Sequence, residues 1–344
     1  MDSGQDRPIC AAEGSTETNQ TAEPLPVAAS ISADSSHHDL KIVNFSRDGE
    51  KVGTRYPQSP PPDSLDHGVG TVFKALPDGS FLELITTGET SPELKFLHWS
   101  SSGFDITDRL HFGGKVFVPP RWSPTLLHAV RMPTDVRRSG RARVLFNRVS
   151  EILRTFINLP EEMHVPIVVY VLATWFPESL AVAPLLWITG PPTSVKTTLL
   201  RLLHCLCRRP ILVTDLTPAA LYSLPALLKP TLLIDECELG NSAADQHLIR
   251  LIRAGSTRGV HVPRQGDVFD PFCPKAVASR TWPDDAAVAS RAVFIAMLPT
   301  RRSLPAFDPQ LIGDEVDALQ AELLDFRLQN FHLVRSPQLR PLPI

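Results

Sequence analysis

The chain has 344 residues, enough for one large or two modest domains with a hydrophobic core. The chain has 34 Lys and Arg and 37 Asp and Glu, a formal net charge of -3. This balance excludes the class of strongly basic proteins that bind nucleic acid over their whole surface. The five cysteines form no CxxC pair, so we expect reduced thiols and a cytoplasmic protein. The longest apolar run, residues 165–176, is too short to span a bilayer, so we expect no membrane partner.

The N-terminal third divides into two parts by composition. Residues 1–68 are rich in Ser, Thr, Asp, Glu and Pro and poor in large apolar residues, which predicts a disordered region. Residues 69–122 contain short alternating runs, which predict a small β-rich unit. The runs 71–76 and 81–85 flank the turn Pro77-Asp78-Gly79 and predict a hairpin.

Two helices are predicted in the segment 140–183. The first, over 143–156, carries apolar residues at three- and four-residue spacing, and the second, over 161–175, is apolar nearly all round and so buried. The C-terminal part, residues 301–344, contains a predicted helix over 312–330 and a tail. We expect this last helix to pack on the preceding domain as a short lid.

Residues 184–300 alternate between apolar strands and helices. A leucine-rich helix is predicted over 197–208. Continuous apolar strands are typical of a parallel sheet that is covered on both faces, so the sequence predicts an α/β fold. The five candidate strands are 185–189, 211–213, 231–234, 276–278 and 292–297.

A candidate phosphate-binding loop connects the first of these strands to the leucine-rich helix. Backbone N–H groups of such a loop and of the helix N-terminus bind phosphate, and the helix dipole favours negative charge there. Lys196 would reach the β- and γ-phosphates of ATP, and the Thr197 hydroxyl would ligate Mg²⁺. The residues of the candidate loop are Gly190, Pro191, Pro192, Thr193, Ser194, Val195, Lys196, Thr197 and Thr198.

The loop departs from the pattern G-x-x-x-x-G-K-[ST] because Val195 occupies the second glycine position. Glycine there allows close backbone approach and an unrestricted φ, and a β-branched residue supplies neither easily. The alternative interpretation is an ordinary strand–loop–helix connection with a solvent-facing lysine.

An acidic pair follows the apolar strand 231–234. Asp235 at the strand tip could hold the water shell of Mg²⁺, and Glu236 could polarise an attacking water molecule. The alternative is that the two carboxylates only begin a loop. An adjacent acidic pair favours a nucleotide-hydrolysing protein over a small-molecule kinase.

The stretch 144–298 resembles P-loop ATPases of the helicase type from phages, plasmids and integrated elements, including primase-helicase C-terminal domains of the D5 type. The resemblance implies an AAA+-like P-loop NTPase sheet, with strand 275–279 between the phosphate-loop and acidic strands. The segments that carry it are LATWFPESLAVAPLL, TGPPTSVKTTLLRLL, VTDLTPAALY, PTLLIDE, FCPKAVAS and ASRAVFIAM.

The resemblance implies roles for individual residues. Lys196, Thr197, Asp235 and Glu236 match the nucleotide and magnesium residues. Arg291 matches an arginine that completes the site of a neighbouring subunit, which implies a homo-oligomeric ring; the alternative is a surface ion pair. The family usually has a polar amide at a sensor position just after the strand 276–278. This chain has Ser279 or Arg280 there and so departs from the family's pattern.

A second implied feature is a DNA-gripping hairpin within 260–274, with the turn Gln265-Gly266-Asp267. Arg258, His261 and Arg264 could contact phosphates of single-stranded or duplex DNA. The alternative is a solvated basic loop, and the basic run 137–143 has the same two interpretations.

Two hypotheses therefore remain open at the level of sequence. The first is an ATPase, helicase-like, that works on DNA within a mobile genetic element with ATP and Mg²⁺ as cofactors. The second is a nucleotide-binding regulatory or assembly module that has lost hydrolysis, which Val195 and the missing amide favour. A P-loop kinase is disfavoured because no acceptor site or arginine-rich lid is evident.

Overall fold

The computed structural model describes residues 68–88, 92–192, 194–214, 216–237, 239–240, 242–264, 266–298 and 303–335. It also gives the backbone of three strands nearer the N-terminus, which pair as a small antiparallel sheet. The remainder of the segment predicted to be disordered lies outside the described residues. The three strands are β1 (Ser30–Ala33), β2 (Leu40–Phe45) and β3 (Lys51–Val52).

A five-stranded sheet forms the centre of the fold, in the order β12-β13-β16-β11-β17, with every neighbouring pair parallel. This confirms the predicted strands and places β16 between the strand that precedes the candidate loop and the strand that precedes the acidic pair. The strands are β11 (Leu185–Thr189), β12 (Pro210–Val213), β13 (Thr231–Ile234), β16 (Lys275–Ser279) and β17 (Ala292–Ala296).

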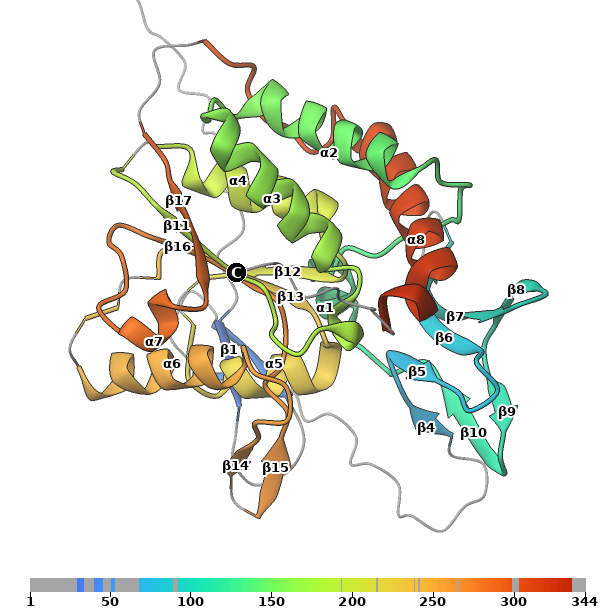
Figure 1. Cartoon of the computed structure of the whole chain (residues 1–344). Coiled ribbons are helices and arrows are strands. Elements are labelled where there is room, and N and C mark those ends of the chain that lie inside the picture. The colour runs from blue at the N-terminus through green and yellow to red at the C-terminus, as the bar shows by residue number, and fades with distance from the viewer. Residues whose placement is uncertain are drawn as a thin grey trace, which may run out of the picture.

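Helices cover both faces of this sheet, as Figure 1 shows. On one face lie α2 (Ala142–Phe156), α3 (Glu161–Ala173), α4 (Lys196–Leu206) and α8 (Gly313–Arg335). On the other lie α5 (Ala220–Leu228), α6 (Ala243–Ala254) and the short α7 (Ala286–Ala289). Two further short elements are α1 (Pro124–Ala129) and the 3-10 helix η1 (Pro177–Ser179).

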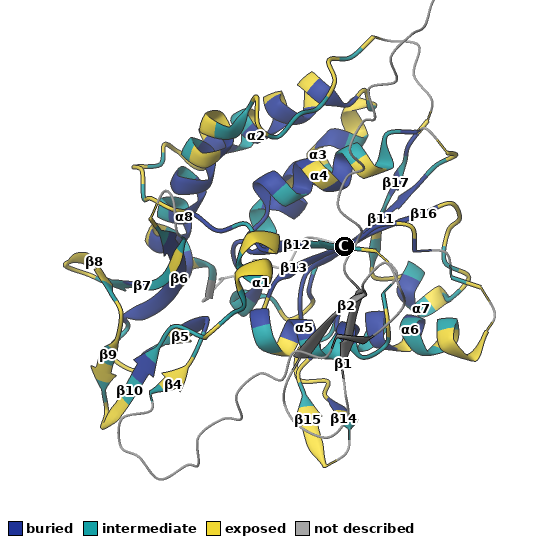
Figure 2. Ribbon diagram, turned by 180° about the vertical axis from the view of Figure 1, so that it is seen from behind, coloured by how far each residue is buried: buried dark blue, intermediate teal, exposed yellow. Residues whose placement is uncertain are grey.

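Side-chain alternation along β11 divides the core between the two faces. Leu186 and Ile188 pack with the leucines of α4, whereas Leu185 and Trp187 pack with α5, α6 and α7. All five residues of β11 are buried, because helices exclude water from both sides. The strand is dark in Figure 2 for this reason.

The predicted β-rich unit exists and contains two small sheets. The predicted hairpin is confirmed by the antiparallel register from Phe73 opposite Glu83 to Ala75 opposite Phe81. The four-stranded antiparallel sheet contains β5 (Phe73–Ala75), β6 (Phe81–Thr87), β7 (Glu93–Ser100) and β8 (Gly103–Thr107). The other contains β4 (Val69–Gly70), β10 (Lys115–Val118) and β9 (Leu110–Phe112).

The C-terminal helix α8 packs on the preceding domain as predicted, but as an integral part of the core and not as a short lid. Leu319 and Leu323 are fully buried against the cluster that contains α2 and α4. Phe331 packs on Phe81 of the β-rich unit, with ring centroids 4.8 Å apart. The helix therefore joins the β-rich unit to the α/β sheet, because one apolar stripe contacts both.

A two-stranded hairpin of β14 (Val262–Arg264) and β15 (Asp267–Phe269) projects from the α5–α6 side of the molecule (Figure 1). This confirms a hairpin within 260–274. Gly266 has φ +90°, which suits glycine at a tight turn, and Gln265 lies outside the described residues. Among the described residues, every helix is too short or too polar to traverse a lipid bilayer.

Candidate functional site

The candidate loop and the acidic pair meet at one edge of the central sheet. Thr189 of β11 is the register partner of Ser279 of β16, and Ile234 of β13 is the partner of Val277. Because these strands are parallel, their carboxyl ends lie at the same edge, where α/β proteins bind ligands. The residues that follow them, Gly190 and Asp235, are therefore separated by the width of a single intervening strand.

The candidate loop starts with a glycine that the fold requires. A Cβ atom on Gly190 would lie 2.3 Å from the backbone oxygen of Met297 and 2.5 Å from Oγ of Ser194, so no other residue fits without a shift. The Ser194 side chain is buried, and its backbone N–H donates to Pro191 O at 3.3 Å. Thr193, also predicted to bind the nucleotide, lies outside the described residues. The loop thus folds closely over the end of β11.

Val195 adopts a left-handed conformation, with φ +56° and ψ +22°. This region is a genuine outlier for a β-branched residue and costs about 1–2 kcal/mol. Val195 precedes the first residue of α4 and makes no side-chain cap. The sequence places valine where the pattern has glycine, and the structure shows the backbone conformation that makes glycine preferable there.

The Lys196 ammonium folds back over the loop. Its Nζ donates to Gly190 O at 2.6 Å and to Pro191 O at 3.0 Å. Thr197 is exposed and Thr198 is half-buried in the first turn of α4, where N–H groups without an intrahelical acceptor and the helix dipole favour an anion. The Lys196 ammonium and the N–H groups of the first turn of α4, which are the donors expected of a phosphate site, therefore lie close to Gly190.

The acidic pair has one buried and one exposed member. The Asp235 carboxylate is buried and accepts a hydrogen bond from Glu236 N–H at 3.0 Å. Glu236 is exposed and has φ +51°. The next residue, Cys237, donates its N–H to Ala278 O of β16 at 2.9 Å. This bond fixes the acidic turn against the strand that separates it from the candidate loop.

Backbone strain concentrates at this edge. Four non-glycine residues with positive φ occur in the described chain, and two of them, Val195 and Glu236, lie in the two turns that face the site. Strained backbone of this kind costs about 1–3 kcal/mol per residue and clusters at functional sites. The described residues contain no group of three His, Cys, Asp or Glu suited to a metal ion. A magnesium ion at Thr197 and Asp235 would therefore take most of its oxygen ligands from phosphate and water.

Arg291 lies at the opposite edge of the sheet. It immediately precedes β17, whose register runs from Ala292 opposite Leu185 to Ala296 opposite Thr189. The five-residue strand separates it from the candidate loop by about 16 Å at 3.3 Å per residue. Arg291 is exposed, and its Nη1 donates to Ala287 O at 2.6 Å. Arg291 is therefore placed away from the candidate site of its own chain.

The two arginines predicted to contact DNA have partners within the chain. Arg258 donates its Nε–H to Leu180 O at 2.8 Å, and its guanidinium lies 4.3 Å from the centroid of the Phe272 ring. Arg264 lies 5.7 Å from the Tyr222 ring centroid and contacts His247. These contacts hold the Arg258 side chain against Leu180 and Phe272, and the Arg264 side chain against α5 and α6. Neither residue lies at the edge that carries Lys196.

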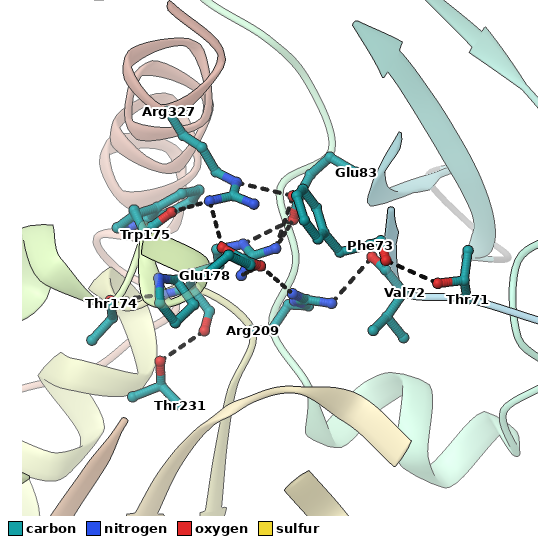
Figure 3. Close-up of polar contacts among 12 residues, drawn as sticks. Thr71, Val72, Phe73, Glu83, Thr174, Trp175, Glu178, Arg209, Thr231 and Arg327 are labelled. Carbon is teal, nitrogen blue, oxygen red and sulfur yellow. Dashed lines mark hydrogen bonds and ion pairs between the residues drawn. The ribbon is translucent and has the colours of Figure 1, made fainter. Parts of the chain in front are cut away.

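A buried ionic cluster is the main polar feature that the sequence did not reveal (Figure 3). Arg208 and Arg327 both donate to the Glu83 carboxylate and both donate to Glu178. Arg209 donates its Nη1–H to Val72 O at 3.2 Å. The cluster lies just beyond the C-terminal end of α4, the helix that begins at Lys196. The cluster had two signals in the sequence: the adjacent Arg208 and Arg209 after an apolar helix, and Glu83 within an apolar strand.

The cluster strongly perturbs two of its groups. Burial opposes ionisation of Glu178, but the guanidinium groups of Arg208, Arg327 and Arg209 outweigh burial and hold its pKa well below the usual range. Burial, reinforced by the charge of Arg208, lowers the pKa of Arg209 to about 9. Three guanidinium groups thus surround two carboxylates.

No model of a known protein family matches the chain, and no curated protein matches it. A solved structure of JCV helicase is 16% identical with a TM-score of 0.35, over 57% of this chain and 60% of that one. The C-terminal region of NrS-1 is 10% identical with a TM-score of 0.40, over 70% of this chain and 66% of that one. The chain spans less than two thirds of either neighbour, and TM-scores below 0.5 assign it neither family nor function.

Proposed function

We propose that this protein binds ATP with Mg²⁺ and hydrolyses it to act on DNA, as a helicase-like P-loop ATPase of a mobile genetic element. The observation that carries the proposal is the meeting of the Gly190–Lys196 loop and the Asp235–Glu236 turn across β16. A phosphate-binding loop and a metal-holding carboxylate must lie this close to act on one nucleotide.

The arrangement of the sheet supports an AAA+-like P-loop class. The strand before the loop, β11, is separated from the acidic strand β13 by β16, as the sequence resemblance implies. The inserted strand separates the two turns by the width of one strand. A direct β11–β13 pair would bring the loop and the carboxylates closer together.

Each residue of the site has a role in this proposal. Lys196 exchanges its bonds to Gly190 O and Pro191 O for the β- and γ-phosphates, because an ammonium donates more favourably to a charged acceptor. Thr197, through its hydroxyl, and Asp235, through its carboxylate, would hold Mg²⁺, which would supply positive charge beside the phosphates. The exposed Glu236 polarises the attacking water.

The proposed action on DNA rests on the sequence resemblance and on the projecting hairpin. Val268 on β15 is 66% exposed, and the hairpin stands clear of the α5–α6 layer (Figure 2). Arg264 would supply a contact to a DNA phosphate by giving up its present contacts to His247 and Tyr222. DNA binding by this hairpin would fall with rising salt, because counterions are released on binding.

The position of Arg291 supports a ring of subunits. An arginine about one strand length from its own loop cannot stabilise charge on the nucleotide of the same chain, but it could serve a neighbouring copy. The proposal therefore includes a homo-oligomer in which each site takes Arg291 from the next subunit.

The alternative function is a nucleotide-binding regulatory or assembly module without hydrolysis. The strained backbone of Val195 favours it, because a β-branched residue makes the left-handed loop conformation costlier than glycine would. The intact Lys196 and the Asp235–Glu236 pair favour hydrolysis. The two proposals share the binding site and differ in turnover.

A steady-state ATPase assay with and without single-stranded DNA tests the proposal, with ATP affinity measured in parallel by calorimetry. We expect Mg²⁺-dependent turnover that DNA stimulates, and loss of ATP binding in Lys196→Ala. Binding without turnover at any DNA concentration would favour the regulatory alternative. Equal ATP affinity of wild type and Lys196→Ala would overturn the nucleotide site.

A further inference from the structure

Arginines just before and at the start of α2 form a concentration of positive charge that neither the nucleotide site nor the hairpin uses. Residues 137–143 contain four arginines and no acidic residue, although the chain as a whole has a formal net charge of -3. All four arginines are exposed to solvent. We refer to these side chains as the arginine patch: Arg137, Arg138, Arg141 and Arg143.

The chain itself neutralises little of this charge. Arg137 pairs with Asp135, with Nε 3.5 Å from Oδ2, and both side chains are more than half exposed, so water and salt screen the pair. Within the part of the chain that the structure describes, the other three arginines of the patch make no ion pair. The patch therefore presents positive charge to solvent and is open to a negatively charged partner.

The backbone that carries the patch is held on α8. The Arg137 N–H donates to Ala321 O at 3.3 Å, and the Ser139 N–H donates to Oδ2 of Asp325 at 2.6 Å. The same carboxylate oxygen accepts a hydrogen bond from Nε2 of Gln329 at 2.6 Å. The Asp325 carboxylate, which reaches the segment from α8, is thus engaged by two other donors, and the segment that bears the arginines has a defined position.

The start of α2 reinforces the positive charge of the patch. Arg141 is the N-cap residue of this helix and makes no side-chain cap, and the first turn, which contains Arg143, has no acidic residue. The first N–H groups of a helix have no acceptor within the helix, and its dipole favours negative charge there. Ser, Thr, Asp or Asn usually meets this need. An anion at the patch would accept from the helix start and balance the arginines at the same time.

The partner that matches these features is a polymer of phosphates. A guanidinium donates two parallel N–H bonds to phosphate oxygens, a match that the lysine ammonium does not make, and the patch consists of arginine alone. Its four members follow one another along a single segment, so they suit phosphates that recur along a chain. A single free phosphate would leave most of them unused.

We propose that the arginine patch binds the phosphate backbone of DNA and is a second DNA-binding surface, separate from the β14–β15 hairpin. This inference rests on the proposed action on DNA and is independent of the nucleotide site. The patch lies where α2 and α8 cover one face of the central sheet, whereas the hairpin projects from the α5–α6 side (Figure 1). Contacts to phosphates carry no sequence information directly, so the patch binds DNA of any sequence.

The test measures binding of the full chain to fluorescent oligothymidine and to a duplex of equal length, by anisotropy over a series of salt concentrations. The test variant combines Arg137→Gln, Arg138→Gln, Arg141→Gln and Arg143→Gln. We expect it to bind DNA about 10- to 100-fold more weakly at moderate salt. The slope of log affinity against log salt should flatten by about 3 on the single strand and about 4 on the duplex, since each lost phosphate contact removes about 0.7 or 0.9.

A second variant removes the same number of positive charges elsewhere and is the matched control. It combines Lys74→Gln, Arg109→Gln, Lys115→Gln and Arg121→Gln, at exposed positions in or beside the β-rich unit. We expect its DNA affinity to change less than about 3-fold, because these charges lie outside the patch. Replacing the four arginines of the patch by lysine keeps the charge and should keep the salt slope while lowering affinity less than glutamine does.

The outcomes separate this inference from the proposed function. Wild type that binds DNA, with the glutamine variant of the patch unchanged in affinity and salt slope, would overturn the inference and leave the hairpin as the DNA contact. Equal losses in the patch variant and the matched control would overturn it too, because net charge alone would then explain binding. If the glutamine variant unfolds at a lower temperature than wild type, the lysine variant decides by its salt slope. Wild type that binds no DNA would overturn both the inference and the proposed action on DNA.

Discussion

Arg208 and Glu83 form a two-point ion pair in the interior of the protein. Arg208 donates Nε–H to Oε1 and Nη2–H to Oε2 of Glu83, each at 2.8 Å. The residues are 125 positions apart, and their side chains are 2% and 3% exposed. Arg208 follows the helix that begins at Lys196, and Glu83 lies in the β-rich unit. The pair therefore ties that unit to the far end of the helix that starts the candidate site.

Removing the Glu83 carboxylate should destabilise the protein strongly. Glu83→Ala leaves Arg208 and Arg327 buried without their shared carboxylate, and breaking a buried pair in this way costs about 3–5 kcal/mol. Urea unfolding measures the loss. Asp108→Ala is the control, because the exposed pair with Lys95 is worth less than about 1 kcal/mol. Equal losses in the two variants would contradict the importance of the cluster, and Glu83→Gln serves if the alanine variant does not fold.

Stability should fall in acid through Glu178. Its pKa is lower in the folded chain than its ordinary value of 4.5. A carboxyl with a depressed folded pKa contributes stability that is fully present above its unfolded pKa and is lost as pH falls toward the folded value. Unfolding by urea from pH 7 to pH 3 should therefore show a loss of stability that begins near pH 4.5.

Glu178→Gln should be less stable than wild type at pH 7 and should lose less stability on acidification, because the titrating group is gone. Glu162→Gln, at an exposed position of α3, is the control and should retain the wild-type pH profile. A Glu178→Gln profile parallel to that of wild type would show that other carboxyls cause the acid sensitivity.

Val195→Gly should tighten ATP binding several-fold. Glycine adopts φ +56° without the cost of about 1–2 kcal/mol that the β-branched residue bears, so the loop can close on phosphate more easily. Val195→Ala removes the branch but keeps the Cβ atom, and its affinity should lie between the two. Calorimetry checks the order. Weaker binding by the glycine variant would show that the loop holds phosphate in a different register from the one proposed.

Glu236→Gln should retain ATP and Mg²⁺ but hydrolyse about 10²- to 10⁴-fold more slowly, the scale of a lost general base. Asp235→Asn should instead weaken the Mg²⁺-dependent part of ATP binding, because its carboxylate would hold the metal-bound water. Single-turnover kinetics and calorimetry separate the two effects. Undiminished turnover in Glu236→Gln would exclude Glu236 as the base and favour a regulatory module.

Arg291 should act between subunits. Arg291→Ala should bind ATP normally and hydrolyse it poorly, and an excess of Lys196→Ala subunits should restore part of the activity, because each variant supplies the group that the other lacks. ATPase activity per wild-type chain should rise with protein concentration, because higher concentration favours assembly. Light scattering on the same samples should show assembly over the same range of concentration. Flat activity per chain over concentrations where the protein stays monomeric would argue against the ring.

Local patterns predicted much of the central sheet. The continuous apolar runs at β11 and β13 predicted both strands to the residue, because burial on both faces demands such runs. The place of β16 between them came from the sequence resemblance and is confirmed by the strand order. The short helices α5 and α6 were not predicted, since their apolar spacing is brief and α5 contains Pro225.

The sequence by itself determined the chemical identity of the candidate site: Lys196, Asp235 and Glu236 follow apolar strands, and Val195 occupies a position that the motif reserves for glycine. Only the tertiary structure decided that Val195 is left-handed and that Arg327 meets Glu83, 244 positions away. Strand and loop patterns are local, because they depend on the burial of consecutive residues. Ion pairs such as Arg327–Glu83 depend on which distant segments the whole fold brings together, and a pattern of consecutive residues does not predict that.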